Sequence, residues 1–367
     1  MKKQYQDYML EQLQAIMAID SPSGYTAEIQ EYMLEQLKAI MAIDSPSGYT
    51  ADIQKYMNEE LARLGYKPEN PIKGGIRAHL GGEGEPIMLM AHVDTLGAMV
   101  DCVKPNGRLM LSRIGGLQAT NVETMNVKVK TRFDGEYEGT IQLENASAHV
   151  NMELSTLKRD FMSNMEVVLD EDVRSAEDVA KLGIRAGDIV AVEPRLTITS
   201  KGYIKSRFLD DKASAAVLLA LAKMIADENI QLKRSIWISF TVYEEVGHGA
   251  AHGIPDGIVE MMSVDMGCVG DTMTCTEKQV SICAKDGGGP YNYEVTTALL
   301  KAAIDNNIDY AIDVYHAYSS DVDVSLRAGY DIKHSLIGPG VYASHGYERT
   351  HIDGLTATFD LLVAYLL

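Results

Sequence analysis

Residues able to bind metal ions gather at a few points of the sequence, directly after stretches of apolar residues. His92-Val93-Asp94 follows the apolar run 86–91, and Glu244-Glu245 follows the apolar segment 235–243. Similar residues stand at three further points, which are Asp210-Asp211, Asp265 and His351-Ile352-Asp353. Carboxylate oxygens and imidazole nitrogens without thiolates suit zinc, cobalt or manganese. The pattern therefore predicts a metal site made of side chains from distant parts of the chain.

Two of these groups make physical sense when a cation is present. Glu244 and Glu245 follow a strongly apolar segment, and two unpaired carboxylates at a buried strand end would be very costly. In His92-Val93-Asp94, an imidazole that binds a metal could donate its other N–H to the carboxylate, which is a common arrangement. Taken singly, paired carboxylates are usually a solvated surface, and a lone histidine usually packs in a core. The prediction depends on the combination.

The segments that would position these residues alternate between strands and helices. Continuous apolar runs at 86–91, 235–242 and 259–264 are typical of buried strands in a parallel sheet. Helical spacing is found at 213–226, 295–306 and 355–367. This alternation predicts an α/β fold with a doubly wound, mostly parallel sheet and helices on both faces. In such folds the functional residues collect at the carboxyl ends of the strands.

The middle of the chain has a different pattern. Polar and apolar residues alternate at 126–130 and 139–144, with Asp134-Gly135 between them, which is typical of antiparallel strands joined by a hairpin. Residues 170–182 read as an acidic amphipathic helix. We therefore expect a small β-rich domain at 103–200, inserted into a catalytic domain that consists of 32–102 and 201–367.

The chain begins with a tandem repeat. Residues 8–31 and 32–55 differ at only three positions, and the period is 24 residues. Each copy has helical apolar spacing and ends at Ser-Pro-Ser-Gly, which breaks helices. Two copies are fewer than a solenoid needs. We interpret 1–31 as a locally duplicated helical segment, and the alternative is an added helix that covers a surface or contacts another subunit.

Composition excludes several classes of protein. The chain has 367 residues, 46% of them hydrophobic and 23% charged, which is ordinary for a globular protein and not for a disordered or membrane-spanning one. The formal net charge of −19 disfavours nucleic acid as a partner. The four cysteines form no Cys-x-x-Cys pair, and no apolar signal segment follows the first lysines. These features predict a cytoplasmic protein with reduced thiols and no membrane partner.

From about Met33 to the C-terminus, the sequence resembles the tetrahedral (TET) or glutamyl aminopeptidases, a family of dinuclear metallopeptidases. The resemblance rests on motifs in a specific order, namely Ala-His-Val-Asp-Thr-Leu-Gly at 91–97, Phe-Leu-Asp-Asp-Lys at 208–212, Tyr-Glu-Glu-Val-Gly at 243–247, Val-Asp at 264–265 and Glu-Arg-Thr-His at 348–351. No Gly-x-Ser-x-Gly elbow and no P-loop compete with this interpretation.

The resemblance implies two divalent metal ions in each subunit, zinc or cobalt. It implies five ligands, with His92 and Asp265 on one ion, Glu245 and His351 on the other, and Asp210 between the two. Glu244 would be the general base, and Asp94 would orient His92. His345 lies six positions before His351 and is a rival for the last ligand. The register after Glu348-Arg349 favours His351.

The implied activity is that of a metal-dependent aminopeptidase, which removes N-terminal residues from short peptides. The resemblance also implies that the inserted domain is PDZ-like and mediates dimerisation, and that the dimers assemble into hollow homododecamers. Two alternatives stay open. One is a deacylase, or an enzyme with the endoglucanase label given to some relatives, that uses the same dinuclear site. The other is a non-catalytic assembly protein with a vestigial site.

Overall fold

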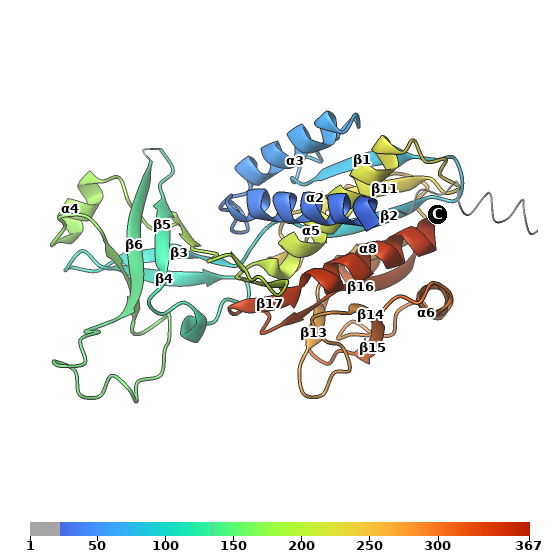
Figure 1. Cartoon of the computed structure of the whole chain (residues 1–367). Coiled ribbons are helices and arrows are strands. Elements are labelled where there is room, and N and C mark those ends of the chain that lie inside the picture. Colours follow the sequence, from blue (N-terminus) through green and yellow to red (C-terminus); the bar gives the residue numbers. More distant parts are fainter. Residues whose placement is uncertain (1–22, 134) are drawn as a thin grey trace, which may run out of the picture.

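The computed structural model describes residues 23–133 and 135–367. Most of the predicted segment 1–31 therefore lies outside the described residues. Figure 1 shows two bodies, a larger one in which helices cover a sheet and a smaller one made mainly of strands. The larger body is formed by the chain on both sides of the smaller one, as expected for an inserted domain.

The larger body is built on an eleven-stranded mixed sheet. Its centre is the parallel series β11 (Ile236–Thr241), β2 (Ile87–His92), β12 (Glu260–Val264) and β16 (Lys333–Tyr342). Antiparallel pairing adds β1 (Ile76–Gly81), β9 (Thr197–Ile198), β10 (Tyr203–Ser206), β14 (Val280–Lys285) and β17 (Glu348–His351). Two further strands pair parallel, namely β13 (Gly267–Val269) with β16 and β15 (Tyr310–Val314) with β14. The predicted α/β class is confirmed.

Helices cover both faces of the sheet because the side chains of its central strands alternate between two cores. Ile87 and Leu89 of β2 join the larger core, whereas Met88 and Met90 join a second core that includes Val322. The larger core is formed with α2 (Ser23–Met41), α3 (Ala51–Arg63), α5 (Leu209–Asp227), α6 (Tyr293–Asp305) and α8 (Ile352–Leu366). The second core contacts α7 (Asp321–Arg327). Figure 1 shows α2, α5 and α8 together over one face.

Helix α5 is the central helix of this fold. Residues 213–222 are all buried, because α5 lies between the sheet and the neighbouring helices α2 and α8. A helix that is apolar on all sides is expected in such a position. Its first turn includes Lys212, whose ammonium donates to the carbonyls of Ile40 and Ile43 at 2.9 and 2.8 Å. Lys212 thereby ties the start of α5 to the end of α2.

The inserted body is a closed barrel of antiparallel strands. The six strands follow the order β3 (Gly97–Val103), β4 (Leu109–Ile114), β7 (Met165–Leu169), β6 (Glu136–Leu143), β5 (Asn126–Lys130) and β8 (Ile189–Val192). The expected β-rich insertion is present, but a closed barrel stands where the resemblance implied a PDZ-like domain. The predicted helix at 170–182 is limited to α4 (Ala176–Lys181), because the Ser175 side chain caps it by accepting from the Asp178 amide.

The two repeat copies differ in conformation where both are described. Residues 23–31 of the first copy are part of α2, whereas the equivalent 47–55 form a turn followed by the start of α3. The turn is held because Pro46 forms a bridge with Thr95. The described end of the first copy packs on α8, where the Gln30 amide donates to Thr356 at 2.9 Å.

Within the described residues, no helix is both long and apolar enough to cross a membrane. All four cysteines are free, and Cys275 and Cys283 are buried, whereas Cys102 is exposed.

Candidate active site

The carboxyl ends of the central strands lie side by side and carry most of the predicted site residues. His92 is the last residue of β2, and Asp265 directly follows β12, its parallel neighbour. Glu244 and Glu245 follow β11, which pairs parallel with β2 on the other side. Asp210 lies in the first turn of α5. The sheet therefore brings together residues that are far apart in the sequence, as the strand-end argument predicted.

Three site segments use backbone conformations that non-glycine residues rarely adopt. The φ angles of Phe208, Tyr243 and His345 are 67°, 71° and 61°, all in the left-handed region. Such conformations persist only where the surrounding structure holds them. Phe208 stands shortly before Asp210, and Tyr243 directly precedes Glu244. We infer that these turns direct the acidic side chains and His345 into a common space.

The ligand-type side chains form two groups that share one carboxylate. His92, Asp210 and Asp265 form one group and Asp210, Glu245 and His345 the other, and within each group the potential ligand atoms lie within 4.8 Å of one another. Oδ1 of Asp210 is 3.1 Å from Nε2 of His92, and Oδ2 is 3.4 Å from Nε2 of His345. Asp210 thus presents one oxygen to each group, as a bridging ligand would.

Burial disfavours the negative charge of the carboxyl groups that gather at this point. It raises the pKa of Glu244 and of Glu245 well above the usual range, and raises that of Asp265 to about 7. Asp210 is also buried, which disfavours its charge, but hydrogen bonds from His345 and His92 outweigh burial and lower its pKa. Charges of one sign held so close together need a cation as a partner.

The unpaired oxygens of the site give a direct test of whether metal ions fit. Oε1 of Glu245 and Oδ1 of Asp265 are buried and have no hydrogen-bond partner. A buried carboxylate oxygen without a partner is costly. Each of the two belongs to one of the two ligand-type groups. The donor set, made of carboxylates and imidazoles without thiolates, therefore fits divalent cations in both groups.

The structure corrects the prediction that His351 lies with these residues, because His345 takes that position. Nδ1 of His351 accepts from the amide of Asp353 at 3.0 Å and caps α8. Its Nε2 lies 2.7 Å from the carbonyl of Lys201. Both ring nitrogens are therefore occupied by backbone groups, and neither is free for a metal ion.

Asp94 is placed beside His92 as predicted, but its carboxylate has additional partners. The closest acceptor to Nδ1 of His92 is the main-chain carbonyl of Asp94 at 3.0 Å, and the carboxylate oxygen Oδ1 is 3.6 Å away. The carboxylate accepts from the Ser47 hydroxyl and from the Glu244 amide. Asp94 thus links Ser47, in the turn before α3, to the predicted general base.

Glu348 is a site residue whose role the sequence did not reveal. Its Oε2 accepts from the Asp210 amide at 3.1 Å, and its Oε1 accepts from the His345 amide at 2.9 Å. Glu348 therefore fixes the backbone of two ligand-type residues at once. Burial raises the pKa of Glu348 to about 8, and the nearby Asp210 acts in the same direction. Glu348 is the first residue of the Glu-Arg-Thr-His motif, and from this motif we predicted only the position of the last histidine ligand.

The inserted barrel also contributes to the site. A Cβ atom at Gly116 would lie 2.4 Å from Nδ1 of His345, so only glycine leaves the imidazole in this position. The Asn121 amide donates to the His345 carbonyl at 3.1 Å. Residues 115–121 follow β4, which is a barrel strand. The position of His345 therefore depends on how the barrel packs against the catalytic domain.

A model of the M42 glutamyl aminopeptidase family matches residues 74–361 of the chain. This protein belongs to the M42 family. A Bacillus subtilis protein named "Putative aminopeptidase YhfE" is 44% identical over 296 residues, which cover 80% of this chain and 85% of that protein. The resemblance predicted from the sequence motifs is confirmed.

Solved structures with low sequence identity have the same fold as this M42 family member. "Aminopeptidase APDkam598" from the archaeon Desulfurococcus kamchatkensis matches with a TM-score of 0.82 at 21% identity, covering 92% of this chain and 95% of that one. The TET1 peptidase of Pyrococcus horikoshii matches with a TM-score of 0.79 at 22% identity, covering 91% and 99%. That archaeal peptidase can assemble into a tetrahedron or a large octahedral shell.

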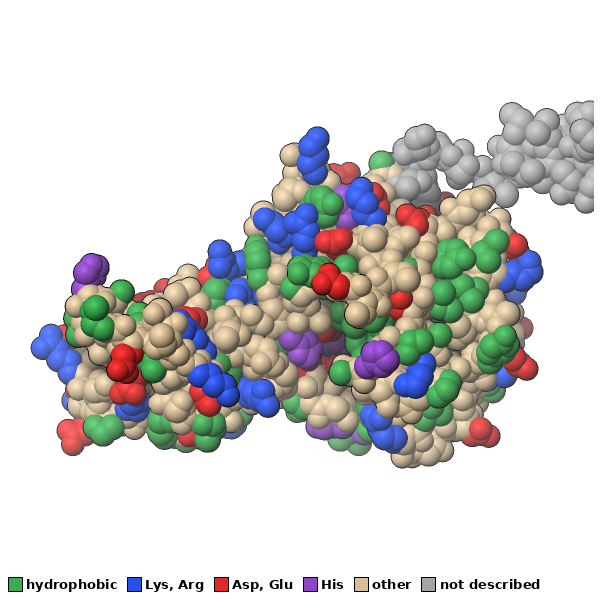
Figure 2. Space-filling view, turned by 90° about the horizontal axis from the view of Figure 1, so that it is seen from below, with side chains coloured by type: hydrophobic (Ala, Val, Ile, Leu, Met, Phe, Trp, Pro, Cys, Tyr) green, Lys and Arg blue, Asp and Glu red, His purple; other side chains and the backbone are tan. Residues whose placement is uncertain are grey.

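Four of the five ligand-type residues of this M42 family member line a cavity of about 460 Å³. Figure 2 shows a face on which histidine and acidic side chains gather at a hollow. The cavity is lined by the ligand-type residues Asp210, Glu245, Asp265 and His345, by Glu244, and by Gln118, Gly247, Met266, Cys268, Ala317, Tyr318, Ser319 and Ser344. A cavity of this size can accommodate part of a peptide next to the acidic cluster.

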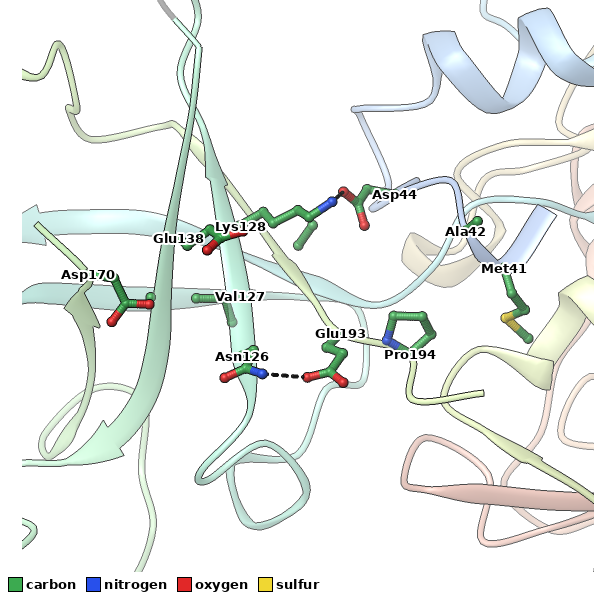
Figure 3. Close-up of a pocket in the computed structure, with 12 residues that line it drawn as sticks. Met41, Ala42, Asp44, Asn126, Val127, Lys128, Glu138, Asp170, Glu193 and Pro194 are labelled. Atoms are coloured by element: carbon green, nitrogen blue, oxygen red, sulfur yellow. Dashed lines mark hydrogen bonds and ion pairs between the residues drawn. The ribbon is translucent and has the colours of Figure 1, made fainter. Parts of the chain in front are cut away.

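A second cavity, of about 450 Å³, lies where the end of α2 meets the barrel. Figure 3 shows its polar side chains pairing with one another. Asp44 lies 3.4 Å from the ammonium of Lys128, and the Asn126 amide donates to Glu193 at 2.9 Å. None of the predicted site residues lines this cavity.

Proposed function

We propose that this protein is a metal-dependent aminopeptidase that removes N-terminal residues from short peptides. The observation that carries the proposal is the single carboxylate of Asp210, which is shared by two groups of ligand-type residues at the edge of a cavity. Membership of the M42 family supports peptidase chemistry. The shared carboxylate and the unpaired oxygens of Glu245 and Asp265 favour a site with two cations.

In this proposal two divalent ions, zinc or cobalt, are held by side chains of both groups. The ligands are His92 and Asp265 on one side, Glu245 and His345 on the other, and Asp210 between them. Bound ions would supply the Lewis acidity that makes water a nucleophile near neutral pH and polarises the scissile carbonyl.

Glu244 is the proposed general base. Its Oε2 lies 3.7 Å from Nε2 of His92, so the carboxylate borders the proposed metal site without belonging to either ligand-type group. The carboxylate takes a proton from the attacking water as the new C–O bond forms. It gives this proton to the leaving nitrogen as the C–N bond breaks. The bond from the Glu244 amide to Asp94 fixes the base in this position.

We further propose that the protein acts in the cytoplasm and self-associates through its barrel into a homododecamer. The support for assembly is the overall similarity to a peptidase that forms tetrahedral shells. A closed shell would admit short or unfolded peptides and exclude folded proteins.

The proposed function is tested by measuring hydrolysis of one tripeptide with a free and with a blocked N-terminus, before and after removal of metal. The metal-loaded protein is expected to cleave a tripeptide with a free N-terminus, to leave the N-acetylated tripeptide intact, and to lose activity after dialysis against a chelator. Zinc or cobalt should restore the activity. Release of amino acids is measured by chromatography, with a β-glucan as an additional substrate.

Each alternative predicts a different result in the same assay. Cleavage of only the N-acetylated peptide would point to a deacylase, and release of sugar would point to a glucan hydrolase. Failure of the protein to bind metal or cleave any substrate would favour a non-catalytic assembly protein.

The role of Glu348 gives a separate prediction. Glu348→Gln is expected to weaken metal binding by about 10–100-fold, which is the usual cost of losing a partner that orients a metal ligand. The reason is that a glutamine side chain has one acceptor atom, so the amide of either Asp210 or His345 loses its partner. Metal affinity is measured by competition with a fluorescent chelator. The control is Glu294→Gln, which removes an exposed ion pair with Lys333. Equal affinities for Glu348→Gln and the control would contradict the positioning role.

A further inference from the structure

The cavity next to the proposed metal site is lined by two kinds of residues, the charged residues of that site and uncharged residues around them. The carboxylates that line the cavity are the proposed ligands Asp210, Glu245 and Asp265 and the proposed base Glu244. Among the described residues that line it, none is lysine or arginine. All the charge of the cavity is therefore at the metal site, and the surrounding walls carry none.

One wall is formed by a short strand and a loop of the catalytic domain. Met266 and Cys268 come from the β13 region, and Ala317, Tyr318 and Ser319 come from the segment before α7. The Tyr318 hydroxyl donates to the Met266 carbonyl at 2.9 Å, which joins the strand to the loop. This wall is therefore a connected surface of uncharged side chains.

The thiol of Cys268 adds no charge to this wall. Cys268 is a free cysteine, and an ordinary thiol is mostly protonated at neutral pH. A neutral cysteine behaves as a small apolar side chain. Cys268 lines the same cavity as the ligand-type residues Asp210 and Asp265.

Other residues that line the cavity are polar, and one of them belongs to the inserted body. Gln118 lies two residues after Gly116, which packs on His345, and its amide donates to the Gly116 carbonyl at 3.0 Å. Ser344, from the catalytic domain, also lines the cavity. Amide and hydroxyl groups of this kind suit the backbone of a peptide, whereas the wall with Met266 and Cys268 suits a side chain.

From this asymmetry we infer that the enzyme selects peptides whose N-terminal side chain is uncharged and apolar, such as leucine or methionine. Met266, Cys268 and Tyr318 form the wall that this side chain contacts. The inference rests on the proposed aminopeptidase function and goes beyond it by naming the substrate class. It also departs from the glutamyl preference that the name of the family expresses.

The physical reason is the cost of an unpaired charge near the metal site. A glutamyl N-terminus would need a cation in the wall, and a lysyl N-terminus would need a carboxylate that is not engaged with a metal ion. The lining residues supply no cation, and their one carboxylate outside the ligand-type groups is that of the proposed base Glu244. A charged side chain placed there would lose its hydration without gaining a partner, whereas an apolar side chain gains from burial.

The test is a substrate profile of the metal-loaded wild-type enzyme, which requires no variant. Tripeptides X-Ala-Ala with X as Leu, Met, Ala, Glu or Lys are compared by kcat/KM. Leu and Met are expected to exceed Glu and Lys by roughly 100-fold. A higher kcat/KM for Glu or Lys than for Leu would overturn the inference while leaving the aminopeptidase function intact. Failure to cleave any of the five would instead contradict the proposed function.

A matched pair of variants tests the wall itself. Cys268→Asp is expected to raise the Lys-to-Leu ratio of kcat/KM by about tenfold or more, because it adds a carboxylate beside the substrate side chain. Cys268→Ser, similar in size and uncharged, is expected to keep the wild-type ranking. Metal content and circular dichroism identify a misfolded variant, in which case Ala317→Asp replaces it. An unchanged Lys-to-Leu ratio in a folded, metal-loaded aspartate variant would remove that residue from the specificity wall.

Discussion

Replacing Glu244 by glutamine is expected to lower kcat for peptide hydrolysis by about 10²–10⁴-fold, the usual contribution of a general base. The amide of glutamine keeps the size and hydrogen-bonding shape of the side chain but cannot take a proton from water. Glu244 belongs to neither ligand-type group, so the metal content is expected to be unchanged. KM should change little, because the lost interaction acts mainly in the transition state.

The measurement is steady-state hydrolysis of a leucyl tripeptide with metal analysis of the same sample. Glu59→Gln is the matched control, because Glu59 lies on α3 and its side chain is 67% exposed. The control should retain wild-type kcat. Wild-type turnover in a fully metal-loaded Glu244→Gln sample would exclude this residue as the base.

Local sequence pattern was sufficient to predict the part of the site that lies at strand ends. The continuous apolar run before His92 marks a strand buried on both faces, and the same holds for the strands before Glu244 and Asp265. Because these strands are parallel neighbours, their carboxyl ends meet at one edge of the sheet. Three of the five predicted ligands, His92, Glu245 and Asp265, therefore lie at one edge, and Asp210 joins them from the first turn of α5.

The position of the last proposed ligand depends on contacts that no local pattern contains. His345 is positioned by Glu348 within a turn, and by Gly116 and Asn121 from the barrel, more than two hundred residues earlier in the chain. His351, by contrast, is the N-cap of α8. Both histidines follow plausible motifs, and only the path of the chain through β16 and β17 decides which one faces Asp210.

The shape of the inserted domain was beyond sequence reasoning for a similar reason. The alternation at 126–130 and 139–144 predicts the antiparallel hairpin of β5 and β6, which is present. Closure into a barrel depends on the pairing of β8 with both β3 and β5. Such pairing is set by strand number, tilt and register, which polar and apolar alternation does not specify.

The two histidines that the sequence left as rivals provide the second large expected effect. His345→Ala is expected to reduce metal binding and peptidase activity by more than the roughly 10–100-fold that follows the loss of a partner that only orients a ligand. It removes the one imidazole of the second group, and leaves Glu245 and a single oxygen of Asp210 to hold that ion. Elemental analysis should give a lower metal content per chain than in the wild-type protein.

His351→Ala is the matched comparison, because it removes the same side chain six residues later. Its imidazole accepts from Asp353 and contacts the Lys201 carbonyl, so its loss is expected to cost about 0.5–2 kcal/mol of unfolding free energy as an N-cap. Metal content and kcat of the folded variant should match the wild type, since neither ring nitrogen faces the ligand-type groups. The reverse result, with metal lost on His351→Ala and kept on His345→Ala, would require a different fold of residues 343–351. It would also remove Asp210 from its proposed bridging position, because the second oxygen of Asp210 faces His345.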